Sequence, residues 1–243
     1  DPGVTLKALT EKLLLLSPRN SSDLRSRREK IKERHSEQRS KLKATAEGFR
    51  NNKPIHPSWV AYCLNQVMDD DTILLNEYTL DISQIDFRHP GSYFGLSPAG
   101  GLGCSIGAGM GVKLARPDKT CIITMGDGTY IFNVPTACHY VSRAYDLPSL
   151  VIILNNGAYG ASKRAVLDVF PDGWASSTDM FPLCDLTPSP KYEVLVSASG
   201  GYGEAVDEPD EVLPALRRAL KVVREERRQA VLNVICAGPG SQR

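Results

Sequence analysis

The stretch that decides the fold is CIITMGDGTY, residues 121–130. Its first half, CIITM, is a largely apolar run, typical of a strand that is buried on both faces of a parallel sheet. Its second half places an acid, Asp127, between two glycines. Glycines allow a sharp turn and a close approach of the backbone to a ligand. Taken alone, such a triplet is more typical of a simple turn, so its meaning depends on the rest of the chain.

A second apolar run, LPSLVIILNN at residues 147–156, ends in two asparagines. Residues 129–154 separate GDG from the asparagine pair, and these 26 residues suffice for a loop, a helix and a returning strand. The spacing therefore predicts that Asp127 and Asn156 follow neighbouring parallel strands. A carboxylate, an amide oxygen and a nearby main-chain carbonyl are hard oxygen donors, which Mg²⁺ prefers when diphosphate oxygens and water complete the octahedron.

Strand and helix patterns alternate on both sides of this pair. Strands are predicted at 72–76, 120–126, 147–156, 201–206 and 229–237, and helices at 98–115, 133–146, 159–170, 191–200 and 209–228. Such alternation favours a parallel sheet with helices on both faces. The sequence therefore predicts an α/β fold with three α/β/α layers and a mainly parallel sheet, whose ligands bind beyond the carboxyl ends of the strands.

The first part of the chain differs from the rest. Residues 21–43 hold nine Lys and Arg against four Asp and Glu, a net charge of +5, with few apolar positions. This pattern is typical of an exposed helix or helical linker. We therefore expect a charged helical arm at 1–50 and a globular domain at 51–243. Because the chain begins with Asp1, it is interpreted as a piece of a longer polypeptide or a subunit of a split enzyme.

Composition excludes several classes. The chain is 42% hydrophobic and 23% charged with a net charge of +1, which is ordinary for a globular protein and argues against nucleic-acid binding. No apolar run approaches the roughly 18 residues of a membrane span. The six cysteines lack zinc-like spacing, so we interpret them as buried thiols in a reducing compartment, the cytoplasm or an organelle matrix.

These motifs resemble the diphosphate-binding module of thiamine diphosphate-dependent enzymes. GDG followed by NN looks like the signature of that family. SPAGGLGCSIGAGMGVKLARPDK (97–119) and GYGEAVDEPDEVLPALRRAL (201–220) are similar to the acetolactate synthase and benzoylformate decarboxylase branch. The resemblance covers roughly residues 55–237. The spacer is slightly longer than is usual in the family, so a longer loop is expected near residues 132–135.

The resemblance implies thiamine diphosphate and Mg²⁺ as cofactors, with a specific site. The metal ligands would be Asp127, Asn156 and the main-chain carbonyl of Ala158. The full set of implied cofactor-binding residues is Tyr78, Thr79, Gly100, Leu102, Gly126, Asp127, Gly128, Thr129, Asn156, Gly157 and Ala158. Gly128, Thr129 and Gly157 match diphosphate contacts, and amide donors suit such an anion. Gly100 and Leu102 match the backbone grip on the aminopyrimidine, and Leu102 also matches the residue that keeps the cofactor bent.

The resemblance also implies something this chain lacks. In the family, a glutamate from a separate pyrimidine-binding domain activates the cofactor, and residues 1–50 are too short and too charged to form that domain. We therefore expect no catalytic residue here and a partner domain or subunit that completes the site in a homo- or hetero-oligomer. The implied activity is decarboxylation or carboligation of a small 2-oxo acid. Substrate identity and flavin dependence stay open.

Two other functions were weighed. A non-catalytic or regulatory subunit would keep the fold without turnover. A serine hydrolase would use Ser105 within Gly103–Gly107, which fits GxSxG, but that elbow requires a preceding strand. The dinucleotide pattern GxGxxG fails at Ile106. His139 beside Cys138 is interpreted as packing, and His89 is equally typical of a loop residue or a substrate contact.

Overall fold

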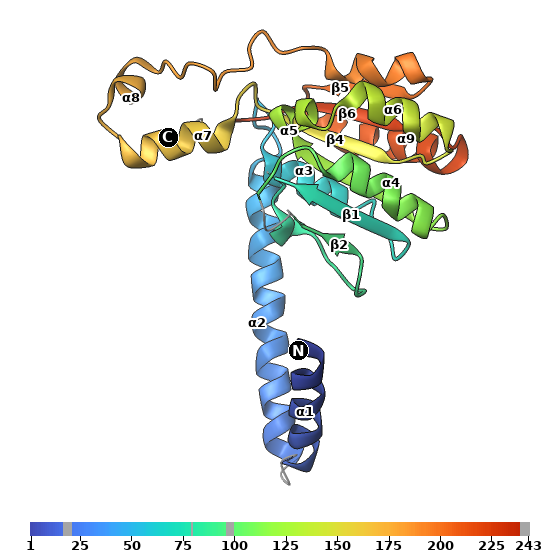
Figure 1. Ribbon diagram of the computed structural model, residues 1–243. Helices are drawn as coiled ribbons and strands as arrows, with labels where there is room; N and C mark the ends of the chain where they lie inside the picture. The colour runs from blue at the N-terminus through green and yellow to red at the C-terminus, as the bar shows by residue number, and fades with distance from the viewer. Residues whose placement is uncertain (17–20, 79, 96–99, 239–243) are drawn as a thin grey trace. The chain divides into compact units, whose positions relative to one another are not determined.

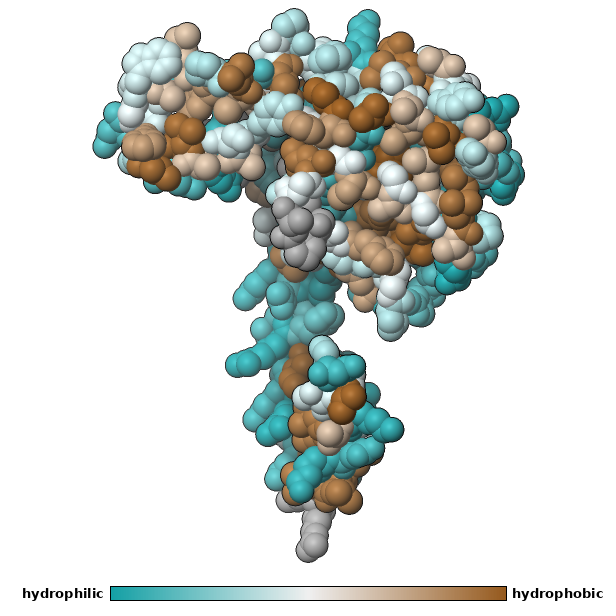
Figure 2. Space-filling model, in the orientation of Figure 1, coloured by the Kyte–Doolittle hydropathy of each residue, from teal (hydrophilic) through white to brown (hydrophobic). Residues whose placement is uncertain are grey.

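The computed structural model describes residues 1–16, 21–78, 80–95 and 100–238. The chain forms two compact units, residues 1–43 and 44–243. In the first unit, α1 (Pro2–Leu15) is followed by α2 (Ser21–Gly48), which continues into the second unit. Leu6, Leu13 and Ile31 are exposed hydrophobic residues of the first unit. Figure 2 shows hydrophobic surface among the hydrophilic side chains of these helices.

A six-stranded sheet forms the centre of the second unit, and every strand pair in it is parallel (Figure 1). The strand order is β2-β1-β3-β4-β6-β5. The strands are β1 (Thr72–Glu77), β2 (Tyr93–Phe94), β3 (Thr120–Gly126), β4 (Leu150–Asn155), β5 (Tyr202–Val206) and β6 (Ala230–Ile235). This confirms the predicted α/β fold with a mainly parallel sheet.

Helices cover both faces of the sheet, because alternate strand residues are apolar on each face. On one face, Leu74, Ile122 and Ile152 pack in a core with α3 (Pro57–Asn65) and α9 (Val212–Glu225). On the other, Ile123 and Ile153 share a second core with α4 (Ser105–Ala115) and η2 (Tyr192–Ser199). The remaining helices are η1 (Ile82–Gln84), α5 (Asp127–Phe132), α6 (Pro135–Ala144), α7 (Gly160–Val169), α8 (Trp174–Thr178) and η3 (Pro209–Glu211).

Several expected element boundaries were wrong. The glycine-rich helix begins at Ser105 instead of residue 98, because Gly100 and Gly103 take φ values of 68° and 95°, outside the right-handed helical region. The expected long loop near 132–135 is absent: only Asn133 and Val134 separate α5 from α6. Sequence reasoning missed α3, α5 and α8, and η2 is a 3₁₀ helix.

The register places the two motif residues at one edge. Gly126, at the end of β3, pairs with Leu154 of β4, so Asp127 and Asn156 follow neighbouring strands as predicted. Glu77, the last residue of β1, lies in the same edge and pairs with Met125. The carboxyl ends of the three strands therefore bring two carboxylates and an asparagine pair together.

Candidate functional site

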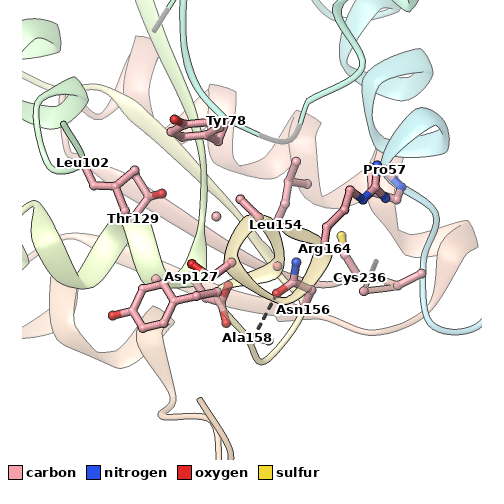
Figure 3. A pocket seen from close by; sticks show the side chains of 18 of the residues that line it. Pro57, Tyr78, Leu102, Asp127, Thr129, Leu154, Asn156, Ala158, Arg164 and Cys236 are labelled. Atoms are coloured by element: carbon pink, nitrogen blue, oxygen red, sulfur yellow. Dashed lines mark hydrogen bonds between the residues drawn. The ribbon is translucent and has the colours of Figure 1, made fainter. Parts of the chain in front are cut away.

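A cavity of about 730 Å³ opens at the carboxyl ends of β3 and β4. This volume suits a ligand of cofactor size. Nine of the expected cofactor residues line it: Tyr78, Gly100, Leu102, Gly126, Asp127, Gly128, Thr129, Asn156 and Ala158. Figure 3 shows Tyr78, Leu102 and Thr129 on one side and Asp127, Asn156 and Ala158 on another. Gly157 is not part of the lining, and Thr79 lies outside the described residues.

Asp127 is the first residue of α5 and is only 1% exposed. Burial raises the pKa of its carboxyl above the ordinary range, although the backbone amides of Gly128, Gly157 and Asn156 act in the opposite direction. Its Oδ2 atom is buried without a hydrogen-bond partner. An unpaired buried carboxylate oxygen is costly, and a bound cation at this oxygen would remove that cost.

The two asparagines have different roles. Asn155 is buried, and its amide donates to Ser189 Oγ at 2.9 Å and Asn233 Oδ1 at 3.1 Å, while its oxygen accepts from Gly157 N at 3.1 Å. Asn156 lines the cavity, and its Oδ1 accepts from Ala158 N at 3.0 Å (Figure 3). The first asparagine therefore holds the turn, and the second offers an amide oxygen with a remaining lone pair to a ligand.

The backbone after GDG lies close to an aromatic ring. A Cβ atom at Gly128 would overlap the ring of Tyr159, which also lines the cavity. Glycine is thus required here by a close approach. Thr129, next in α5, is buried and also lines the cavity. Residues 128 and 129, at the start of α5, are therefore both part of the cavity wall.

Sequence reasoning missed other residues of the lining. They come from the start of α3, the ends of β4 and β6, and α7: His56, Pro57, Ser58, Leu154, Gly160, Ala161, Arg164, Cys236, Ala237 and Gly238, with Asp81. Cys236 follows a parallel strand, so the strand-end rule could have found it. The start of α3 carried a signal too: Pro57 occupies its first turn, and His56 Nδ1 caps it by accepting from Ser58 N at 3.1 Å.

Ser105, His139 and His89, which were considered for other functions, do not line this cavity. Ser105 is in the first turn of α4 and only 4% exposed, unlike the exposed nucleophile of a hydrolase elbow. His139 is buried between Tyr130 Oη and Gln229 Oε1, both at 2.6 Å, so it forms no dyad with Cys138. His89 Nε2 lies 3.2 Å from Asp70 Oδ1, and both side chains are exposed.

Neither a membrane span nor a conventional metal cluster is found in the described part of the chain. No helix there is long and apolar enough to cross a bilayer. No group of three or more His, Cys, Asp and Glu side chains comes together there as a metal site.

Comparisons with known proteins show which proteins this chain is similar to. The chain is 29% identical over 170 residues to a probable acetolactate synthase of Mycobacterium bovis, covering 68% of this chain and 29% of that protein. It is 30% identical over 152 residues to benzoylformate decarboxylase of Pseudomonas aeruginosa, covering 60% and 28%. The thiamine diphosphate-dependent 4-hydroxybenzoylformate decarboxylase of Rhodococcus jostii RHA1 superposes with a TM-score of 0.66 at 28% identity, covering 77% and 33%.

The chain spans about 30% of the length of these relatives. A family model of thiamine pyrophosphate enzymes, for their C-terminal TPP-binding domain, matches residues 77–234. This match begins at Glu77, the last residue of β1, includes GDG and the asparagine pair, and ends at Val234 within β6. Because the match spans more than half of the chain, the protein belongs to the thiamine pyrophosphate enzyme family and carries its C-terminal TPP-binding domain.

Proposed function

We propose that this chain binds thiamine diphosphate through Mg²⁺ and forms the cofactor-binding part of a 2-oxo acid decarboxylase or carboligase. One observation carries the proposal: Asp127 Oδ2 is buried without a partner at the wall of a cofactor-sized cavity. Asn156 Oδ1 and the main-chain carbonyl of Ala158 supply the other protein oxygens. Bound there, the cation would neutralise the Asp127 carboxylate and the diphosphate of the cofactor.

The remaining wall residues have roles that follow from their position. The backbone amide of Gly128 and the Thr129 hydroxyl would hold the diphosphate, whereas the Gly157 amide already donates to Asn155 Oδ1. Gly100 and Leu102 would hold the aminopyrimidine, and the apolar Leu102 side chain would keep the cofactor bent. When bound, thiamine diphosphate supplies a thiazolium that accepts the electrons released as carbon dioxide leaves a 2-oxo acid. The protein's task is to orient this group and exclude water.

Proton transfer at the cofactor requires a group from elsewhere. Among the described side chains of the cavity, the carboxylates are Asp81 and Asp127. Asp127 is assigned to the metal, and Asp81 accepts from Ser58 Oγ at 2.9 Å and caps η1. We therefore propose that a glutamate of a pyrimidine-binding domain, on another part of the polypeptide or on another chain, completes the site in an oligomer.

Calorimetry on the full-length protein tests the cofactor assignment. We expect thiamine diphosphate to bind with Mg²⁺, and binding to be lost when EDTA replaces the metal. Thiamine without its diphosphate should not compete. Equal affinity for thiamine diphosphate in Mg²⁺ and in EDTA would show that the metal assignment is wrong.

A separate assay tests catalysis. The protein purified with its native partner should release carbon dioxide from a 2-oxo acid such as benzoylformate or pyruvate. If cofactor binds but a panel of 2-oxo acids gives no turnover in the complete assembly, the chain belongs to a non-catalytic subunit, and the enzymatic part of the proposal is wrong.

A further inference from the structure

Glu77 is a buried acid that the cofactor assignment does not use. It ends β1, is 1% exposed, and points its carboxylate at the segment before α4. Oε1 accepts from Gly103 N at 2.6 Å and Cys104 N at 3.1 Å, and Oε2 accepts from Ser105 N at 2.9 Å. The Cys104 thiol lies 3.4 Å from Oε1. One carboxylate thus satisfies three successive backbone amides.

Asn133 completes this arrangement from the other side. Its Oδ1 accepts from Ile106 N at 2.9 Å, the next amide along the chain. Its Nδ2 donates to Glu77 Oε2 at 3.2 Å and to Thr129 O at 3.0 Å, and lies 3.7 Å from Met125 Sδ. Asn133 is buried and uses both ends of its amide. Glu77 and Asn133 therefore join the start of α4 to the end of α5.

The helix start itself shows why a distant acid is needed. The first amides of an α-helix have no partner within the helix, and the N-cap residue of α4, Cys104, makes no side-chain cap bond. A negative charge near a helix N-terminus is stabilising. Although burial acts to raise it, the pKa of the Glu77 carboxyl is held below its usual range by the donors from residues 104, 105 and 133.

The segment held in this way leads directly into the cavity. Gly103 has a φ of 95°, and a Cβ there would overlap the carbonyl oxygen of Phe132. Gly100, with a φ of 68°, and Leu102 line the cavity. Three glycines in this short stretch, 100, 101 and 103, would otherwise leave the backbone free to adopt many conformations.

We propose that Glu77 and Asn133 are positioning residues that fix the backbone of residues 100–103 for the aminopyrimidine end of the cofactor. The inference rests on the proposed function, because it assumes that Gly100 and Leu102 hold the pyrimidine. Glu77 does not touch the cofactor. It acts by removing, before binding, the conformational freedom that the segment would otherwise lose on binding.

The experiment compares two ligands in the full-length protein, each with Mg²⁺. Thiamine diphosphate contacts both ends of the proposed site, whereas inorganic diphosphate contacts the metal end alone. We expect Glu77→Gln, which sets an amide against the backbone donors, to raise the Kd of thiamine diphosphate roughly ten- to hundredfold. The Kd of inorganic diphosphate should stay within about threefold of the wild-type value, because this ligand does not contact residues 100–103.

Leu216→Ala is the matched control. Leu216 is a buried core residue of α9 outside the cavity lining, so its truncation lowers Tm without touching residues 100–103. It should leave both Kd values unchanged. If it weakens thiamine diphosphate as much as Glu77→Gln does at a similar loss of Tm, Glu77 is merely structural and the inference is overturned. The inference is also overturned if Glu77→Gln raises the Kd values of both ligands by the same factor.

Asn133→Ser serves if Glu77→Gln does not fold, because it removes the side-chain bonds of Asn133 and leaves the Glu77 carboxylate in place. It should show the same selective loss of thiamine diphosphate. Unchanged thiamine diphosphate binding in a folded variant overturns the inference while the proposed function stands. If wild type binds neither ligand, the proposed function itself fails.

Discussion

Glu77 and Asp127 are both buried acids at the ends of neighbouring strands, β1 and β3, yet their surroundings differ. Every described partner of Glu77 donates to it, and its pKa is lowered. Asp127 keeps one oxygen without a partner, and burial raises its pKa. The first carboxylate is satisfied by the protein and serves the fold of the site. The second is left incomplete and is suited to a ligand.

The largest expected effect concerns Asp127, the acid that is suited to a ligand. Asp127→Asn removes the charge that a metal needs, so the Kd of thiamine diphosphate with Mg²⁺ should rise by more than about a hundredfold, the upper range for loss of a residue that only supports a ligand. Titration calorimetry measures it. Retained affinity would show that the metal lies elsewhere.

A second substitution tests the rigid segment beside Glu77. Gly103→Ala adds a Cβ against the Phe132 carbonyl at a positive φ, which should cost about 3 kcal/mol of unfolding free energy. Gly111→Ala is the control, because a Cβ there meets nothing within 4 Å and alanine favours a helix. Urea unfolding of both variants measures the difference. Equal stability of the two variants would mean that residues 100–103 are not tightly packed.

The smallest effect is a pH dependence in which the two acids act in opposite directions. A lowered folded pKa means that Glu77 contributes stability above its unfolded pKa, near 4.3, and that this is lost as pH falls. A raised folded pKa means that Asp127 costs stability as pH rises above about 4 toward its folded value. Without cofactor, Asp127→Asn should therefore gain stability relative to wild type between pH 4 and 7. Urea unfolding across this range measures the gain, and a constant difference would contradict it.

Much of this molecule could be predicted from its sequence. The runs ending at Gly126 and Asn155 gave their strands, since continuous apolar residues mark strands buried on both faces. GDG and Asn156 were found because they follow these strands directly. The expected placement of Asp127 beside Asn156 agrees with the register of β3 and β4. The roles of these residues toward metal and diphosphate stay predictions.

Other features had no local signal. The start of α4 was placed too early because small residues and a proline resemble a helix start, whereas the positive φ values of Gly100 and Gly103 depend on a carboxylate distant in sequence. Glu77, which directly precedes Tyr78, was not identified as a functional residue. A single acid at the end of a strand does not indicate that its carboxylate accepts from three backbone amides about 26 residues later. Asn133 looked like part of an amphipathic helix, and only tertiary packing gives it four contacts.

The long sequence separation of the Glu77 contacts has a consequence for the order of folding. The amides of residues 103–105 gain their acceptor only when β1 has docked beside β3, and Asn133 must arrive with α5, 56 residues after Glu77. Contacts of such separation form late, because the chain between them must first be ordered. We therefore expect the pyrimidine side of the cavity to be among the last parts to form. An incompletely folded chain would then be unable to hold the cofactor.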